Sequence, residues 1–280
     1  MTFLKYLQKI SHSLPCAPLV TCALTALAPP AMAEEVLSEG YIETFDDADY
    51  RDRWWFSNYE SGGVHSATAW RRKMVSVVIP VVDHDALGGA LTLELAPSND
   101  DTARPFFGAE VQQGGGHHYG DYEVVMKAGK GAGTVTAFFT YTGPHFGAPH
   151  DEIDFEILGK DTTHVWINRF VDGERMPGLH LPLEFDAAAA AHLYRFEWRE
   201  NSITWSVDGQ EIHQVTDADM DIPTHAGKLF LSLWAGHEKQ IAWLGEVDPE
   251  AQTTARFYCV SFRPLGDTGD NCSDEMELPR

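Results

Sequence analysis

Short runs of β-branched and aromatic residues recur along most of this chain, and they favour strands over helices. Each run is bounded by Gly, Pro, Asn or Asp, which is typical of short strands joined by turns. Asp208-Gly209 separates two of the runs and predicts a tight hairpin. The alanine-rich segment 186–192 is too short to organise a helical domain. We expect strands within residues 91–95, 121–126, 134–141, 164–170, 193–199, 203–207, 210–215, 228–234 and 256–262.

The chain between residues 34 and 262 contains no linker and no internal repeat, so these strands belong to one domain. Many short strands without long helices predict an all-β sandwich of the jelly-roll type. We place the domain at residues 34–264. The remaining segment, 265–280, is acidic, and we expect it to be a mobile tail.

The N-terminus has the features of a secretory signal peptide. Lys5 and Lys9 give a basic start, residues 17–27 form a short apolar run, and Ala31-Met32-Ala33 is a small-residue cleavage signal. The alternative is a membrane anchor, but spanning a bilayer takes about 20 apolar residues and this run is much shorter. We therefore expect residues 1–33 to be removed and the protein to be secreted or periplasmic.

Two cysteines, Cys259 and Cys272, remain after such a cleavage. In an exporting compartment they could form a disulfide that ties the acidic tail to the last strand. Two free or metal-bound thiols are the alternative, although two cysteines without a spacing motif make a poor metal site.

The charge balance limits the choice of partner. The 280 residues include 42 Asp and Glu against 20 Lys and Arg, a formal net charge of −22. Binding to nucleic acid or anionic lipid needs an excess of basic groups, so neither is expected as the main partner. A neutral or weakly charged substrate fits this composition better, and we expect the protein to be a monomer.

One predicted strand, in the segment 150–159, carries alternating acidic and apolar residues. Because successive side chains on a strand point to opposite faces, Glu152, Asp154 and Glu156 share one face. The alternative is a solvated acidic edge, but such a strand usually has Lys, Thr or Ser between its acids. Here the intervening side chains are apolar and are expected to pack in the core: Ile153, Phe155 and Ile157.

Clustered carboxyl groups suit glycoside hydrolysis, in which one ionised group attacks the anomeric carbon and a protonated one donates to the leaving oxygen. The Cα atoms of Glu152 and Glu156 are expected about 13 Å apart at a rise of about 3.3 Å per residue. A retaining mechanism needs the carboxyl groups about 5–5.5 Å apart, so the side chains must lean together. Calcium binding is the other use of three acids, but a regular strand offers few of the extra oxygen ligands.

Three motifs now point to a family. Phe138-Phe139-Thr140-Tyr141-Thr142-Gly143-Pro144, then Asp151-Glu152-Ile153-Asp154-Phe155-Glu156, then Leu158-Gly159-Lys160-Asp161-Thr162-Thr163, resemble glycoside hydrolase family 16. The similarity is to bacterial lichenases (endo-β-1,3-1,4-glucanases) and to the glycanases that trim succinoglycan-type exopolysaccharide. More loosely, it extends from about Glu43 to Phe262.

The resemblance implies a concanavalin-like β-jelly roll with a glycan cleft across its concave sheet. It also implies a retaining endo-β-glycanase that hydrolyses internal β-linkages. In that reading Glu152 is the nucleophile and Glu156 the general acid/base. Asp154 lies between them and tunes the nucleophile.

The resemblance also implies which residues line the cleft, at the positions where this chain has the same residue as the family. Glu110 matches a substrate-binding glutamate, and Asn168 falls where a side chain holds a sugar hydroxyl. Phe139, Tyr141 and Trp234 fall on cleft positions where aromatic rings could stack on sugars. We assign the two other tryptophans of the predicted strands to the core: Trp198 and Trp205.

The chain departs from the lichenase pattern at several positions. Gln112 replaces an arginine and His150 replaces a tryptophan. The family's structural calcium loses an aspartate ligand, which aligns with Tyr258. We therefore leave a structural calcium ion undecided. His145 and His150 are not spaced as a recognisable zinc pair, so we expect no cofactor and no catalytic metal. Two further cleft positions differ: Phe170 stands where a tyrosine is found, and Ser232 where an asparagine is found.

Two alternatives to hydrolysis remain. Plant xyloglucan transglycosylases also carry a His-Asp-Glu-Ile-Asp-Phe-Glu run, so His150 admits transfer of the glycosyl group to another sugar. The second alternative is a non-catalytic glycan-binding module with a relict site. The presence of all three carboxyl groups counts against it.

Overall fold

A computed structural model of the protein describes residues 39–47, 49–60, 67–78, 88–99, 102–218 and 220–276. It confirms the all-β prediction: two antiparallel sheets pack face to face, and each of the predicted runs lies within a strand. The predicted signal peptide, residues 1–33, lies outside the described residues. Within the described part, no helix combines the length and the apolar composition that crossing a bilayer requires.

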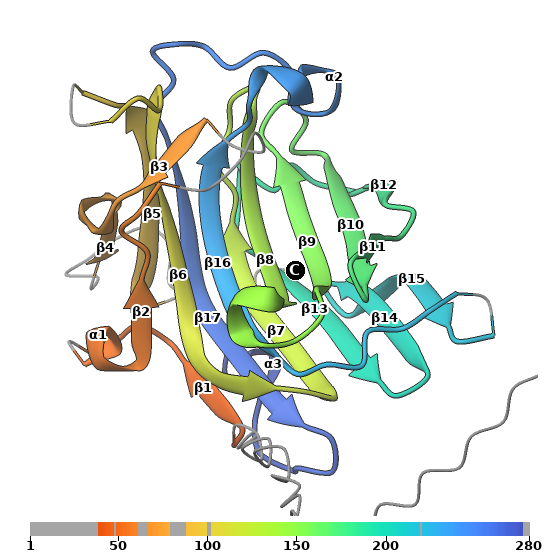
Figure 1. The fold of residues 1–280 in the computed structure, drawn as a ribbon. Helices are drawn as coiled ribbons and strands as arrows, with labels where there is room; N and C mark the ends of the chain where they lie inside the picture. Colours follow the sequence, from red (N-terminus) through yellow and green to blue (C-terminus); the bar gives the residue numbers. More distant parts are fainter. Residues whose placement is uncertain are drawn as a thin grey trace, which may run out of the picture. The chain divides into compact units, whose positions relative to one another are not determined.

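The first sheet, which we call the front sheet, carries the acidic strand near its middle. Figure 1 shows its strands side by side, from β2 in orange to β10 in green. Both β11 and β12 pair with the outer side of β10. In spatial order the strands are β2 (Trp54–Phe56), β6 (Phe106–His117), β16 (Gly227–Ala235), β8 (Thr134–Thr142), β9 (Asp151–Leu158) and β10 (His164–Val171), followed by β11 (Glu174–Arg175) and β12 (Leu179–Pro182).

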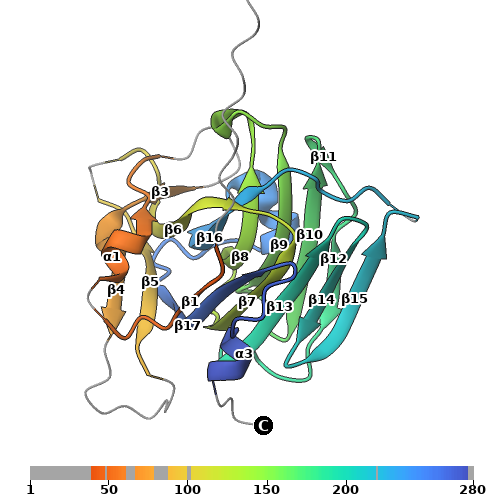
Figure 2. The same ribbon diagram turned by 90° about the horizontal axis from the view of Figure 1, so that it is seen from below.

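The second sheet, the back sheet, covers the other side of the core (Figure 2). β1 (Tyr41–Glu43) pairs with the end of its central strand, β17. The spatial order is β4 (Val75–Val78), β5 (Ala90–Pro97), β17 (Thr253–Pro264), β7 (Gly120–Lys127), β13 (His192–Arg199), β14 (Ser202–Val207) and β15 (Gln210–Thr216). The two sheets meet where β5 pairs with β6, and β3 (Thr68–Trp70) runs parallel to β6 there.

Aromatic side chains fill the space between the sheets behind the acidic strand. Phe155 of β9 is fully buried and packs against Tyr194 and Phe196 of β13, with ring centroids 5.6 and 6.4 Å away. Trp198 and Trp205 are also buried, as predicted. The indole nitrogen of Trp205 donates to the backbone oxygen of Asp154 at 3.2 Å. The core therefore holds the acidic strand from behind while its odd-numbered side chains fill the interior.

Turns and short helices complete the described part. Asp208 and Gly209 both have positive φ, 49° and 76°, as a two-residue hairpin between β14 and β15 requires. Segment 186–192 contains a turn and the first residue of β13, and no helix. The short helices are α1 (Tyr50–Arg53), α2 (Ile241–Leu244) and α3 (Cys272–Glu275), with 3-10 turns η1 (Arg72–Met74), η2 (Pro144–Phe146) and η3 (Glu238–Gln240).

Segment 114–116 lies inside β6, and the buried His117 packs between Tyr41 and Phe262 at that end of the strand. One sequence expectation needs correction. The segment after Pro264 was expected to be a mobile tail, but as far as residue 276 it is attached to the back sheet.

The docking of that segment depends on polar contacts and on a covalent bond. Cys272 forms a disulfide with Cys259 of β17. Ser273 donates its backbone N–H and its hydroxyl to the buried carboxylate of Glu123, at 2.8 and 3.0 Å. The acidic composition of this segment suggested a solvated tail, but the pattern did not reveal the buried acceptor on β7.

Candidate active site

The three carboxyl groups of β9 lie on the outer face of the front sheet, between the strands that flank β9. Glu152 pairs with Tyr141 of β8 and Phe170 of β10. Two residues along, Asp154 pairs with Phe139 and Asn168. Glu156 follows, opposite Ala137 and Trp166. Strand alternation thus gives each acid two neighbours that face the same way.

A cleft runs over these residues as two adjoining hollows of about 1020 and about 900 Å³. The two hollows share Trp70, Glu110, Phe139 and Glu152, so they form one continuous depression. All nine side chains that the sequence singled out line it: Glu110, Phe139, Tyr141, His150, Glu152, Asp154, Glu156, Asn168 and Trp234. Their individual roles stay predictions.

Burial favours the protonated form of two of the three acids. Burial, and then the charge of Glu152, raises the pKa of Glu156 to about 8, against the opposing effect of Arg175. Burial also raises the pKa of Asp154 well above its ordinary value, and the nearby Glu152 and Glu156 add to this. A side-chain hydrogen bond joins Asp154 to Glu152. At neutral pH, therefore, Glu156 can donate a proton, and Asp154 can donate a hydrogen bond to Glu152.

His150 supplies a second donor to Glu152. Its Nε2 lies 2.7 Å from Oε2 of Glu152. The imidazole stacks on Phe170 with ring centroids 4.3 Å apart, and the edge of Tyr141 lies against it at 5.1 Å. Two departures from the lichenase pattern, His150 and Phe170, are therefore in contact and together place a hydrogen-bond donor on Glu152.

Asp151 points the other way and anchors the start of β9. Its Oδ2 accepts hydrogen bonds from the backbone N–H groups of Thr224 and His225 at 2.8 and 2.9 Å, and its Oδ1 from that of Asp172 at 2.8 Å. Burial alone would raise the pKa of Asp151, but these hydrogen bonds outweigh it and lower the pKa. The strand that carries the three acids is thus fixed at its end by a buried, fully bonded carboxylate.

Glu110 on β6 faces β9 across the cleft. Burial raises its pKa, although hydrogen bonds from Ser57 and Tyr59 oppose the shift. Its partners come from the segment after β2, which had no recognisable motif. Glu110 is therefore held in place as a polar group in the cleft wall.

Several cleft residues were not singled out in the sequence. Trp166 could have been found, because it lies two residues before Asn168 on the same predicted strand. Trp243 of α2, Lys239 of η3 and Arg175 of β11 come from segments without a pattern. Among the described residues, four buried polar atoms of the cleft have no hydrogen-bond partner within the protein and are therefore available to bind a polar ligand: Trp166 Nε1, Trp243 Nε1, Asn168 Oδ1 and Gln112 Oε1.

The comparison with protein families agrees with this geometry. The model of the glycosyl hydrolases family 16 matches residues 81–251, more than half of the chain. The chain belongs to glycosyl hydrolase family 16. It is therefore a glycoside hydrolase, and the recognition from its three motifs is confirmed.

Other members of the family resemble it over most of their length. A β-glucanase of Brevibacillus brevis is 34% identical over 84% of this chain and 86% of its own. The endo-1,3-1,4-β-glycanase ExoK of Rhizobium meliloti is 34% identical over 82% and 80%. The crystal structure of a lichenase from a mouse hindgut metagenome superposes with a TM-score of 0.72 at 35% identity, over 81% of this chain and all of the other.

One expected ligand of the structural calcium of family 16 is missing from this chain. The resemblance places Tyr258 where the family has an aspartate ligand, and the Tyr258 side chain is buried beside Val125 and the disulfide. Calcium takes 6–8 oxygen ligands, mostly carboxylates and carbonyls, and a buried aromatic ring supplies none of these. No step of the chemistry below uses a metal ion.

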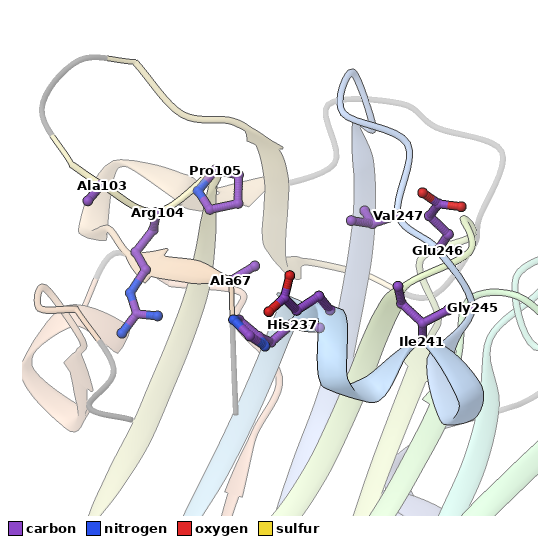
Figure 3. Close-up of a pocket in the computed structure, with 11 residues that line it drawn as sticks. Ala67, Ala103, Arg104, Pro105, His237, Ile241, Gly245, Glu246 and Val247 are labelled. Atoms are coloured by element: carbon purple, nitrogen blue, oxygen red, sulfur yellow. The ribbon is translucent and has the colours of Figure 1, made fainter. Parts of the chain in front are cut away.

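A smaller hollow of about 400 Å³ lies beyond one end of the cleft. Arg104 and Pro105 line one side of it, and Ile241 and Val247 the other (Figure 3). The η3–α2 segment separates it from the cleft, since Lys239 and its neighbours Gln240 and Trp243 face the cleft instead. None of the predicted site residues lines this hollow.

Proposed function

We propose that this family 16 enzyme is a retaining endo-β-glycanase that cleaves internal linkages of a β-1,3/β-1,4-glucan or a related exopolysaccharide. The observation that carries the proposal is the trio on β9, in which Glu156 holds a proton at neutral pH while Glu152 accepts hydrogen bonds from Asp154 and His150. The names of its relatives, β-glucanase and endo-1,3-1,4-β-glycanase, support the choice of substrate.

The reaction proceeds in two displacements. Glu156 donates its proton to the glycosidic oxygen while the carboxylate of Glu152 attacks the anomeric carbon, so the linkage breaks and a glycosyl ester forms. The leaving sugar departs as an alcohol. Glu156, now ionised, then takes a proton from water as the water oxygen attacks the same carbon and releases Glu152. Two inversions leave the anomeric configuration unchanged.

The neighbours of the trio assist each displacement. Asp154 and His150 both donate a hydrogen bond to the Glu152 carboxylate and orient it for attack. The charge of Glu152 itself helps to keep Glu156 protonated before the first step. Once Glu152 is esterified that charge is gone, the pKa of Glu156 falls, and Glu156 can act as the base in the second step.

The decisive experiment is release of reducing ends from mixed-linkage β-glucan by the wild-type protein and by Glu152→Gln. The control is Glu94→Gln, an exposed acid on β5 of the back sheet. We expect cleavage by the wild type and the control, and loss of cleavage in Glu152→Gln. Sizing the products separates hydrolysis from transfer, because longer oligomers without new reducing ends would identify a transglycosylase. Cleavage that persists in Glu152→Gln would exclude the mechanism.

We also propose that the enzyme acts outside the cytoplasm after removal of residues 1–33. The support is the basic, apolar and small-residue order of the N-terminus. N-terminal sequencing of the protein recovered from the periplasm and the medium tests it. A mature chain that begins at Glu34 is expected, whereas a protein that keeps Met1 in the cytoplasm would exclude export.

A further inference from the structure

Two histidines and an aspartate meet at the outer edge of the front sheet, separate from the carboxyl trio. Asp161 lies in the turn between β9 and β10, His164 begins β10, and His180 lies in β12. A ligand-type atom of each lies within 4.8 Å of those of the other two. Asp161 and His164 are only three residues apart in the chain, and the pairing of β12 with β10 brings His180 to them.

The strand register explains this meeting. His180 of β12 pairs with Trp166 of β10, and His164 precedes Trp166 by two residues, so their side chains share one face. The two imidazole rings stack with centroids 4.5 Å apart and planes 24° apart. The His164 ring is partly exposed and the His180 ring is exposed, so both can rotate to accommodate a ligand.

Asp161 is already oriented toward this pair. Its Oδ1 accepts hydrogen bonds from the backbone N–H and the hydroxyl of Thr163, at 3.2 and 2.6 Å. Its Oδ2 lies 3.0 Å from Nδ1 of His164. A carboxylate with one oxygen fixed in this way presents the other at a defined position, which is how outer hydrogen bonds orient metal ligands.

We propose that Asp161, His164 and His180 bind a zinc ion. Two imidazoles and one carboxylate are a common zinc donor set, and a fourth position remains for water. With metal–ligand distances of about 2.0–2.2 Å, ligand atoms of a tetrahedral site lie roughly 3.3 Å apart. Asp161 and His164 already have about this spacing. Only the exposed His180 must move closer.

Zinc at this site would connect the turn after the catalytic strand to the edge strand of the cleft wall. β12 follows the segment that carries Arg175, which lines the cleft. The chain also packs closely on Trp166 here: a Cβ at Gly178 would lie 2.6 Å from the indole ring. Bound zinc therefore stabilises this wall of the cleft. The site is independent of the proposed function, because none of its ligands takes part in the reaction.

Calorimetric titration with zinc chloride tests the site, using protein purified without a polyhistidine tag and treated with a chelator. We expect one zinc ion per chain and a rise of several degrees in the unfolding temperature on zinc addition. Hydrogen exchange of β12 amides should slow. In His180→Ala the affinity should fall at least tenfold and the thermal shift should disappear. Because His180 is exposed, this variant is expected to fold as the wild type does.

The matched control is His225→Ala. His225 belongs to a second group of possible ligands, with Asp151 and Asp172, in which Asp151 is already saturated by backbone N–H groups. Its substitution should leave zinc affinity unchanged. The proposal is overturned if the wild type binds no zinc, if His180→Ala binds it as tightly as the wild type, or if only His225→Ala loses it.

Discussion

Nε2 of His150 lies 2.7 Å from Oε2 of Glu152, and Phe170 stacks on the other side of the imidazole, 4.3 Å away. The ring can turn only by leaving Phe170 and the edge of Tyr141. His150 is thus a positioning residue for Glu152, because it fixes Oε2 of the carboxylate.

Two substitutions of His150 separate its donor from its ring. His150→Phe keeps an aromatic ring against Phe170 and removes the donor, whereas His150→Gln keeps an N–H donor and removes the ring. A hydrogen bond to a charged group contributes about 1.5–3 kcal/mol. We therefore expect kcat/KM to fall roughly 10- to 100-fold in His150→Phe and less in His150→Gln. His213→Ala, on β15 of the back sheet, is the control. Equal losses in both variants of His150 would contradict a donor role.

The pKa of Glu156 predicts the alkaline limb of the pH profile. Burial and the charge of Glu152 raise this pKa to about 8. The first displacement needs the proton on Glu156, so kcat/KM should decline as the pH rises through about 8. Initial rates between pH 5 and 10 measure this, with circular dichroism to verify folding at each pH.

The leaving group provides the control for the pH profile. An aryl β-glycoside loses its phenolate without needing a proton from Glu156. The decline of kcat/KM at alkaline pH should therefore be weaker for the aryl β-glycoside than for the polysaccharide. Undiminished cleavage of the polysaccharide at pH 9, or a limb already complete by pH 6, would contradict Glu156 as the acid.

The sequence was sufficient to predict the strands and the face that carries the three acids. Alternation is a local property, so Glu152, Asp154 and Glu156 could be placed on one face from their spacing, and their neighbours Phe139 and Asn168 followed from the family resemblance. The flanking runs had the β-branched and aromatic composition that half-buried strands need. These features depend on residues close together in the chain.

The sequence was insufficient where a site depends on register between distant segments. The stack of Phe170 on His150 requires β9 and β10 to pair at Glu152, and a shift by one residue would turn either side chain to the other face. Trp243 reaches the cleft from a helix with no distinguishing pattern. The docking of Ser273 on Glu123, 150 residues away in sequence, has no local signal at all.

Removing the Glu156 carboxyl should stabilise the fold at high pH. Its pKa is raised from 4.5 to about 8, so its stabilising contribution is full below about pH 4.5 and is lost as the pH rises through 8. Glu156→Gln stays neutral throughout. We expect the variant to gain stability over the wild type between pH 4.5 and pH 9, by several kcal/mol, because a difference of one pKa unit corresponds to about 1.4 kcal/mol.

Urea unfolding of the wild type and Glu156→Gln at the two pH values measures this difference. The exposed Glu94→Gln should show no such gain. A stability difference that is the same at both pH values would mean that Glu156 ionises in the fold as it does in the unfolded chain.

The disulfide between Cys259 and Cys272 closes a loop of 13 residues and holds α3 against the back sheet. Loops of this size lose about 3 kcal/mol of chain entropy in the unfolded state when they are cross-linked. We expect the double variant Cys259→Ala/Cys272→Ala to be less stable than the wild type by about that amount in urea unfolding. Both cysteines are also fully buried, so their packing is lost in the same variant. Reducing agent should lower the unfolding temperature of the wild type and leave that of the double variant unchanged. If reduction has no effect on the wild type, the contacts of Ser273 with Glu123 hold the segment without the covalent bond.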